Sequence, residues 1–129
     1  MFQYINPVYI RNVWQQVKVG LIAVQRKTGE QWLIEDVYAA LKTGSAQLFT
    51  FPDGFVVLQS LRDQWTNEPC LHIWITHHAG HDDLTEDFIS NLRKLADNAG
   101  VKKVTFTSPR RWDRRSGATL KSYNYELEV

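Results

Sequence analysis

Cysteine is nearly absent from this 129-residue sequence: the single Cys70 cannot form a disulfide within the chain. Proteins that depend on a disulfide framework are therefore excluded, and a reducing compartment is expected. No apolar run approaches the roughly 18 residues that a transmembrane helix needs, so no membrane span is predicted. The first residues, Met1 to Pro7, lack the basic and apolar regions of a signal peptide. This predicts a cytoplasmic protein.

Charge of one sign is not in excess, because 15 Lys and Arg residues are balanced by 14 Asp and Glu residues. A global field that would attract nucleic acid or an anionic membrane is thereby excluded, and recognition by charge must be local. Hydrophobic residues make up 43% of the chain and aromatic residues 12%, enough to fill one core at this length. We expect one globular domain spanning residues 1–129.

The first third of the chain has the pattern of a short strand followed by two helices. A strand is predicted at residues 2–5, after which Asn6-Pro7 supplies a cap and a first helical residue. Apolar residues then recur at helical spacing, although Gly20 predicts a bend or a break. The second helix, at about residues 33–42, is expected to bury Leu33, Val37 and Leu41. Gly44 is placed to take the left-handed conformation just beyond it.

The rest of the chain has the pattern of strands interrupted by one long helix. The predicted elements are a hairpin of strands at 47–51 and 55–61, a buried strand at 70–77, a helix at 84–99, a strand at 103–108, a short helix at 109–115 and one or two strands at 119–129. The apolar side of the long helix is expected to hold Leu84, Phe88, Leu92, Leu95 and Ala99.

Several runs of residues carry a resemblance to a known family. They are Trp32 to Gly44, Gly54-Phe55-Val56-Val57, Leu71-His72-Ile73-Trp74 and Phe106-Thr107-Ser108-Pro109-Arg110. With the element order, they make the chain resemble the GNAT acyltransferase superfamily, and more narrowly the small GNAT-like proteins of tailed phages and prophages. The resemblance implies an α/β fold with a mixed, mostly antiparallel twisted sheet of about six strands and helices on both faces. Related proteins of short-tailed phages are associated with virion assembly.

The superfamily binds the pyrophosphate of acyl-CoA at a loop after its fourth strand. Its signature there is Gln or Arg, two residues, Gly, one residue, then Gly or Ala, and the same register here gives His77, Gly80 and Asp82. Gly80 keeps the pattern, but Asp82 and Asp83 would satisfy the N-terminus of the next helix and repel a diphosphate. If acyl-CoA binds, the resemblance implies that the backbone of Trp74, Ile75 and Thr76 holds the pantetheine arm.

Catalytic residues are weakly marked. The usual general acid of the superfamily, a Tyr near the short helix after the fifth strand, has no match between Pro109 and Gly117. Glu35 and His77 are the remaining candidates for taking a proton from an amine. A structural interpretation is favoured, because Glu35 lies near the predicted N-terminus of a helix, where a carboxylate interacts favourably with the helix dipole. We also expect one satisfied core histidine rather than a catalytic pair.

A metal site is not predicted. Cys70 and His77 are separated by seven residues of strand, or about 23 Å, and so cannot share one ion.

The only dense basic patch lies in one segment. Its residues are Arg110, Arg111, Trp112, Arg114 and Arg115. The patch could hold CoA phosphates, a nucleic-acid backbone or an acidic partner surface, or it could be a solvated helix in which Asp113 pairs with Arg. Nucleic acid is the least expected of these, because single-strand binding also needs more exposed aromatic residues.

Two functions are therefore predicted. The altered loop favours a non-catalytic phage protein without a cofactor, whose basic patch binds a phage structural protein or another acidic surface. Such a protein would lie in the host cytoplasm or on the virion. The alternative is an atypical N-acyltransferase that uses acetyl-CoA. The sequence leaves the oligomeric state undecided.

Overall fold

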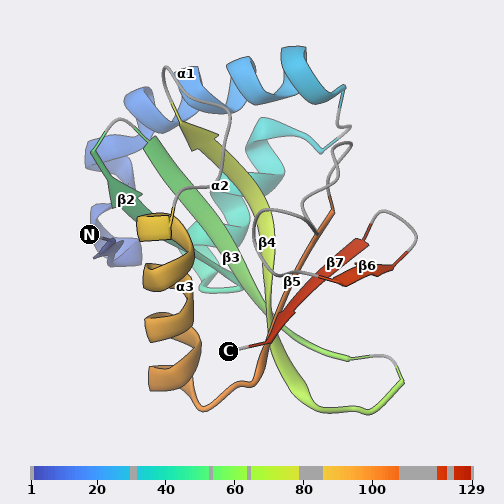
Figure 1. Cartoon of the computed structure of the whole chain (residues 1–129). Helices are drawn as coiled ribbons and strands as arrows, with labels where there is room; N and C mark the ends of the chain where they lie inside the picture. The colour runs from blue at the N-terminus through green and yellow to red at the C-terminus, as the bar shows by residue number, and fades with distance from the viewer. Residues whose placement is uncertain are drawn as a thin grey trace. The chain divides into compact units, whose positions relative to one another are not determined.

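The computed structural model describes residues 2–29, 32–52, 54–63, 65–78, 86–107, 119–121 and 124–128 (Figure 1). The chain forms two compact units. The N-terminal unit comprises Phe2–Leu58 and Ile75–Asp82, and the C-terminal unit comprises Gln59–Trp74 and Asp83–Val129 together with Met1. A single domain over the whole chain stays a prediction. No helix in the described ranges is long and apolar enough to cross a membrane.

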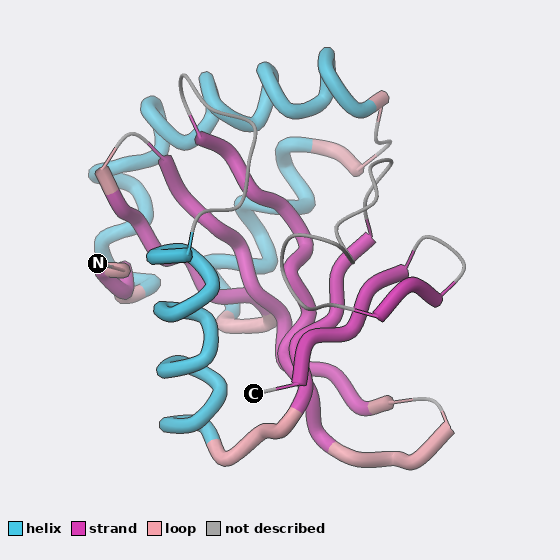
Figure 2. Tube along the Cα trace, in the orientation of Figure 1, coloured by secondary structure: helices cyan, strands magenta, loops and turns pink. Residues whose placement is uncertain are grey.

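The chain runs from a short strand through consecutive helical segments to three strands, a single helix and three final strands (Figure 2). The elements are β1 (Gln3–Ile5), the 3-10 helix η1 (Pro7–Tyr9), α1 (Ile10–Thr28), α2 (Ile34–Thr43), β2 (Ala46–Phe51), β3 (Gly54–Arg62), β4 (Pro69–His78), α3 (Glu86–Ala99), β5 (Lys103–Thr107), β6 (Thr119–Lys121) and β7 (Asn124–Glu128). Hydrogen-bonded neighbours follow the order β1-β2-β3-β4-β5-β7-β6. The β4–β5 pair is parallel, while β1–β2, β5–β7 and β6–β7 are antiparallel. The mixed, mostly antiparallel α/β architecture is confirmed, with seven strands because the terminal segment forms two.

The N-terminal unit begins as the sequence predicts. Asn6 caps η1, because its Oδ1 accepts a hydrogen bond from the Val8 amide at 3.0 Å, and Pro7 occupies the first helical position. The predicted break at Gly20 is wrong, since α1 continues through it to Thr28, and a bend there stays a prediction. Gly20 is buried, and a Cβ atom there would lie 2.5 Å from Cε2 of Phe55. The glycine therefore lets an unbroken helix lie close to β3.

Helix α2 also corrects one prediction. Val37 and Leu41 are buried, as expected, and α2 ends at Gly44, whose φ is 84°. Leu33, however, is 60% exposed. It precedes the helix in an extended conformation, with φ −88° and ψ 143°, so its side chain does not follow the apolar side of α2. Trp14 of α1 packs edge-on against Tyr38 of α2, with ring centroids 4.7 Å apart.

Helix α3 packs on β5 in the C-terminal unit. Its buried side is rotated about the helix axis relative to the predicted one. Its buried residues are Phe88, Ile89, Leu92 and Ala96. Phe88 and Leu92 were predicted, but Leu95 is only half-buried, Ala99 is exposed, and Leu84 lies outside the described residues. Both stripes satisfy the helical period, so the contact with the sheet, rather than the period, selects the buried one.

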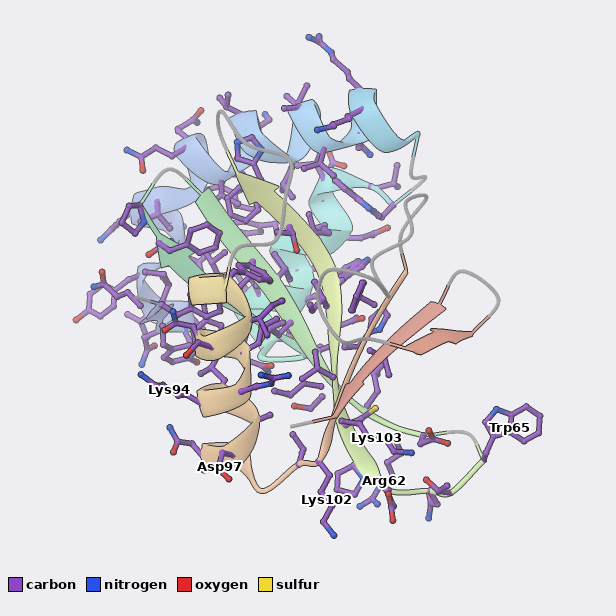
Figure 3. All side chains as sticks on the ribbon, in the orientation of Figure 1. Arg62, Trp65, Lys94, Asp97, Lys102 and Lys103 are labelled. Carbon is purple, nitrogen blue, oxygen red and sulfur yellow. The ribbon has the colours of Figure 1, made fainter. Side chains whose placement is uncertain are left out.

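The loop between β3 and β4 is held by its own hydrogen bonds. Oδ1 of Asp63 accepts from the amides of Trp65 at 2.7 Å and Thr66 at 3.0 Å. The backbone bonds from Thr66 and Trp65 lower the pKa of Asp63, and Nζ of Lys103 lies 3.8 Å from the other carboxylate oxygen. Trp65 is 86% exposed and points away from the strands (Figure 3). These hydrogen bonds use the backbone amide of Trp65 and leave its side chain exposed.

Candidate functional site

Strand β4 is the candidate site because it continues beyond its ladder with β5. The parallel register pairs Leu71 with Val104, His72 with Thr105 and Ile73 with Phe106. No later residue of β4 belongs to this ladder among the described residues, although β4 runs on to His78. Residues 74–76, which the sequence assigned to a pantetheine arm, lie in this extension. An extended ligand with amide groups can add to such an edge as another strand does.

His77 lies near the end of β4, in the N-terminal unit, where its ring is held by neighbouring elements. The ring centroid is 5.5 Å from that of Phe55, and a Cβ atom on Gly20 would lie 2.9 Å from Cδ2 of His77. The His77 carbonyl oxygen approaches Gly54 so closely that any side chain at position 54 would clash with it. The absence of side chains at Gly20 and Gly54 thus makes room for His77. From the sequence alone, these glycines indicate only a helix irregularity and a hairpin turn.

His72 is the satisfied core histidine that the sequence predicts. It is half-buried in the C-terminal unit, and its Nδ1 lies 2.9 Å from Oγ1 of Thr105. Burial lowers the pKa of His72 below the ordinary value of 6.5. The imidazole is therefore neutral at pH 7. The hydrogen bond with Thr105 satisfies the polar Nδ1 atom inside the fold.

The lowered pKa of His72 makes stability depend on pH. Below about pH 6.5 the unfolded chain takes up a proton at this position while the folded chain does not. We therefore expect the free energy of unfolding to fall as the pH drops from 6.5 toward the lower pKa of the folded state. Urea denaturation of the wild type and of His72→Gln across this range measures the contribution, and a smaller pH dependence is expected in the variant. Equal pH dependence in both proteins would contradict it.

The other predicted site residues are less closely tied to β4. Glu35 is exposed in the first turn of α2, beside Asp36. Both carboxylates stabilise the helix there, because the helix dipole is positive at its N-terminus. Its catalytic role stays a prediction. Gly80, Asp82 and the basic patch at 110–115 lie outside the described residues. Within the described ranges, no group of three or more His, Cys, Asp or Glu residues is arranged to hold a metal ion.

Comparison with known proteins identifies the fold. No protein-family model matches the chain, and no curated protein matches it in sequence. The structure is similar to that of a GNAT family acetyltransferase from Brucella melitensis in complex with acetyl-CoA, with a TM-score of 0.67 and 12% identity. The match covers 99% of this chain and 86% of that chain.

A second similar structure is a ribosomal-protein-alanine N-acetyltransferase from Brucella melitensis biovar Abortus 2308. Its TM-score is 0.59 at 13% identity, and the match covers 88% of this chain and 84% of that chain. At such identities structural similarity establishes the fold and not the activity. The narrower resemblance to phage proteins stays a prediction. The two structural similarities show that the chain has a GNAT-like fold.

Proposed function

We propose that this chain binds acetyl-CoA, or a similar acyl-CoA, along residues 74–76 of β4 and transfers the acyl group to an amine. The observation that carries the proposal is that the described β4–β5 ladder includes no residue after Ile73, although β4 runs on to His78. The pantetheine arm of CoA is an extended chain with two amides, which suits the backbone groups of such an edge. The similar GNAT structure that contains acetyl-CoA supports the same ligand.

Each part of the chain then has a defined role. Bound acetyl-CoA supplies the acyl group as an activated thioester. The backbone of Trp74, Ile75 and Thr76 holds the pantetheine arm, and Gly80 lets the backbone of the following loop approach the pyrophosphate. Glu35 has an exposed carboxylate and is the proposed acceptor of the amine proton. The ring of His77 packs against Phe55, so we assign His77 to positioning the end of β4.

Calorimetric titration with acetyl-CoA tests binding. We expect saturable binding with a dissociation constant on the order of 100 μM, and a loss of at least about tenfold in Gly80→Val, because a side chain at this loop position obstructs the approach of phosphate to the backbone. Val19→Ala is the matched control, since Val19 is 70% exposed on α1, and it should bind normally.

Transfer is tested by the release of the CoA thiol in the presence of amine acceptors. Glu35→Gln is expected to lower kcat while leaving acetyl-CoA affinity unchanged, because it removes the proton acceptor and keeps the ligand contacts. Equal kcat in the wild type and the variant would exclude Glu35 from proton transfer.

A non-catalytic interaction protein is the second candidate, and Asp82 and Asp83 at the phosphate position favour it. In that case the wild type should bind acetyl-CoA more weakly than about 1 mM, and Asp82→Gly should increase the affinity. The basic patch at 110–115 would then be the contact for an acidic phage structural protein. The same titration separates the two candidates, because only the acyltransferase requires acetyl-CoA to bind the wild type.

A further inference from the structure

Strand β1 is the outermost of the described strands on its side of the sheet and belongs to the N-terminal unit. It pairs with β2 through Gln3 and Thr50, Tyr4 and Phe49, and Ile5 and Leu48. The strand order places β1 outermost, so no described strand pairs with its other edge. Gln3 is exposed and Tyr4 is 49% exposed. Because successive strand residues point to opposite faces, both faces of the sheet are accessible at this edge.

The segment around this edge is uncharged and aromatic. No Asp, Glu, Lys or Arg occurs from Phe2 to Ile10, although exposed edge strands are usually protected by charged side chains. Tyr4 lies beside Phe49 with ring centroids 5.4 Å apart, and Phe2 lies 5.3 Å from Phe51. Val8 and Tyr9, just beyond the strand, are 74% and 59% exposed.

We propose that β1 pairs antiparallel with β1 of a second copy of this chain. In an antiparallel pair related by a two-fold axis, the donors and acceptors of one edge meet those of the identical edge. The same symmetry places each side chain near its own counterpart, so a charged segment would repel itself. The absence of charge from Phe2 to Ile10 fits this occupant. The one charged group recorded beside this segment, Nζ of Lys42, donates to the carbonyl oxygen of Pro7 at 3.3 Å, outside β1.

The strand length fixes the register and limits the strength of the dimer. Tyr4 is the middle residue of β1, so it faces its own counterpart, whereas Gln3 faces the counterpart of Ile5. Tyr4, Val8 and Tyr9 together offer roughly 350 Å² of accessible side chain. A standard interface buries about 800 Å² on each partner. The dimer is therefore weak and depends on concentration.

Disulfide trapping tests the register. Directly opposed residues of an antiparallel pair have Cα atoms about 4.5–5.5 Å apart, which a disulfide can bridge. In a Cys70→Ala background, Tyr4→Cys should form a covalent dimer on mild oxidation, seen on a non-reducing gel. Gln3→Cys is the matched control and should cross-link at least about fivefold less, because its counterpart lies beyond the bridging limit of about 7 Å. Equal cross-linking of the two variants, or none in Tyr4→Cys, would overturn the proposal.

Sedimentation velocity tests the dimer without the Cys70 substitution. The wild-type sedimentation coefficient should rise with concentration, and Tyr4→Lys should abolish the rise by placing like charges at the axis. Trp65→Ser removes a side chain that is 86% exposed on another loop and should leave the rise unchanged. A wild type that stays monomeric up to about 1 mM, where the free energy of association is about −4 kcal/mol, contradicts the proposal. So does a dimer that survives Tyr4→Lys.

Discussion

Leu92→Ala should lower the free energy of unfolding by about 3–5 kcal/mol, comparable to the whole stability of a marginal domain. Leu92 is 1% exposed on α3, which packs on β5, so the substitution loses apolar burial and leaves a cavity. Urea denaturation with an unchanged m-value measures the loss. Ser90→Ala is the control, because Ser90 is exposed on the same helix and should change stability by no more than about 0.5 kcal/mol. A loss below about 1 kcal/mol for Leu92→Ala would mean that α3 is peripheral.

Gly20→Leu is expected to destabilise the protein by about 3 kcal/mol or more, because α1 has no space for a side chain at this position. A Cβ atom alone would lie 2.5 Å from Cε2 of Phe55 and 2.9 Å from Cδ2 of His77. Phe55 is 4% exposed, so its ring is enclosed by other groups and cannot simply move into solvent. Thermal and urea denaturation measure the effect.

Gly20→Ala tests whether overpacking outweighs the higher helix propensity of alanine at this position. Alanine is better than glycine in a helix by about 1 kcal/mol, so intrinsic propensity alone predicts stabilisation. Overpacking costs about 1–3 kcal/mol and is expected to exceed that gain. Adding Phe55→Leu should make Gly20→Ala less harmful than in the wild type, because the pair shares one contact. Val19→Ala is the control on the exposed side of α1. Stabilisation by Gly20→Ala would show that the helix does not lie close to Phe55.

Burial of His72 connects the core of the C-terminal unit with its behaviour in acid. The hydrogen bond to Thr105 satisfies the neutral ring, but it supplies no charge to stabilise the imidazolium. Acidification therefore favours the unfolded chain at this position. Burial of the ring accounts for the lowered pKa without a catalytic role. Acid lability of the wild type would therefore be consistent with either proposed function.

Local signals in the sequence determined where the elements begin and end. Asn6 caps η1, and Gly29 and Gly44 take positive φ at the ends of α1 and α2. Strands β2 and β3, predicted as a hairpin, are neighbours in the strand order. Each of these features depends on residues that are close in sequence, because capping and left-handed backbone are properties of a few consecutive residues. The resemblance to the GNAT superfamily, carried by the element order together with several residue runs, then implied the α/β fold.

Only the tertiary structure decided what lies against what. The period of α3 allowed two apolar stripes, and the packing on β5 selected the one containing Ala96 instead of Ala99. Gly20 has the same local preference whether it bends a helix or admits Phe55, and only the contact distinguishes these roles. The parallel register of β4 with β5, which pairs His72 with Thr105 in the described ladder, is a property that neither strand's sequence contains by itself. Contacts between distant segments are set by the shape and packing of whole elements, which local periodicity does not encode.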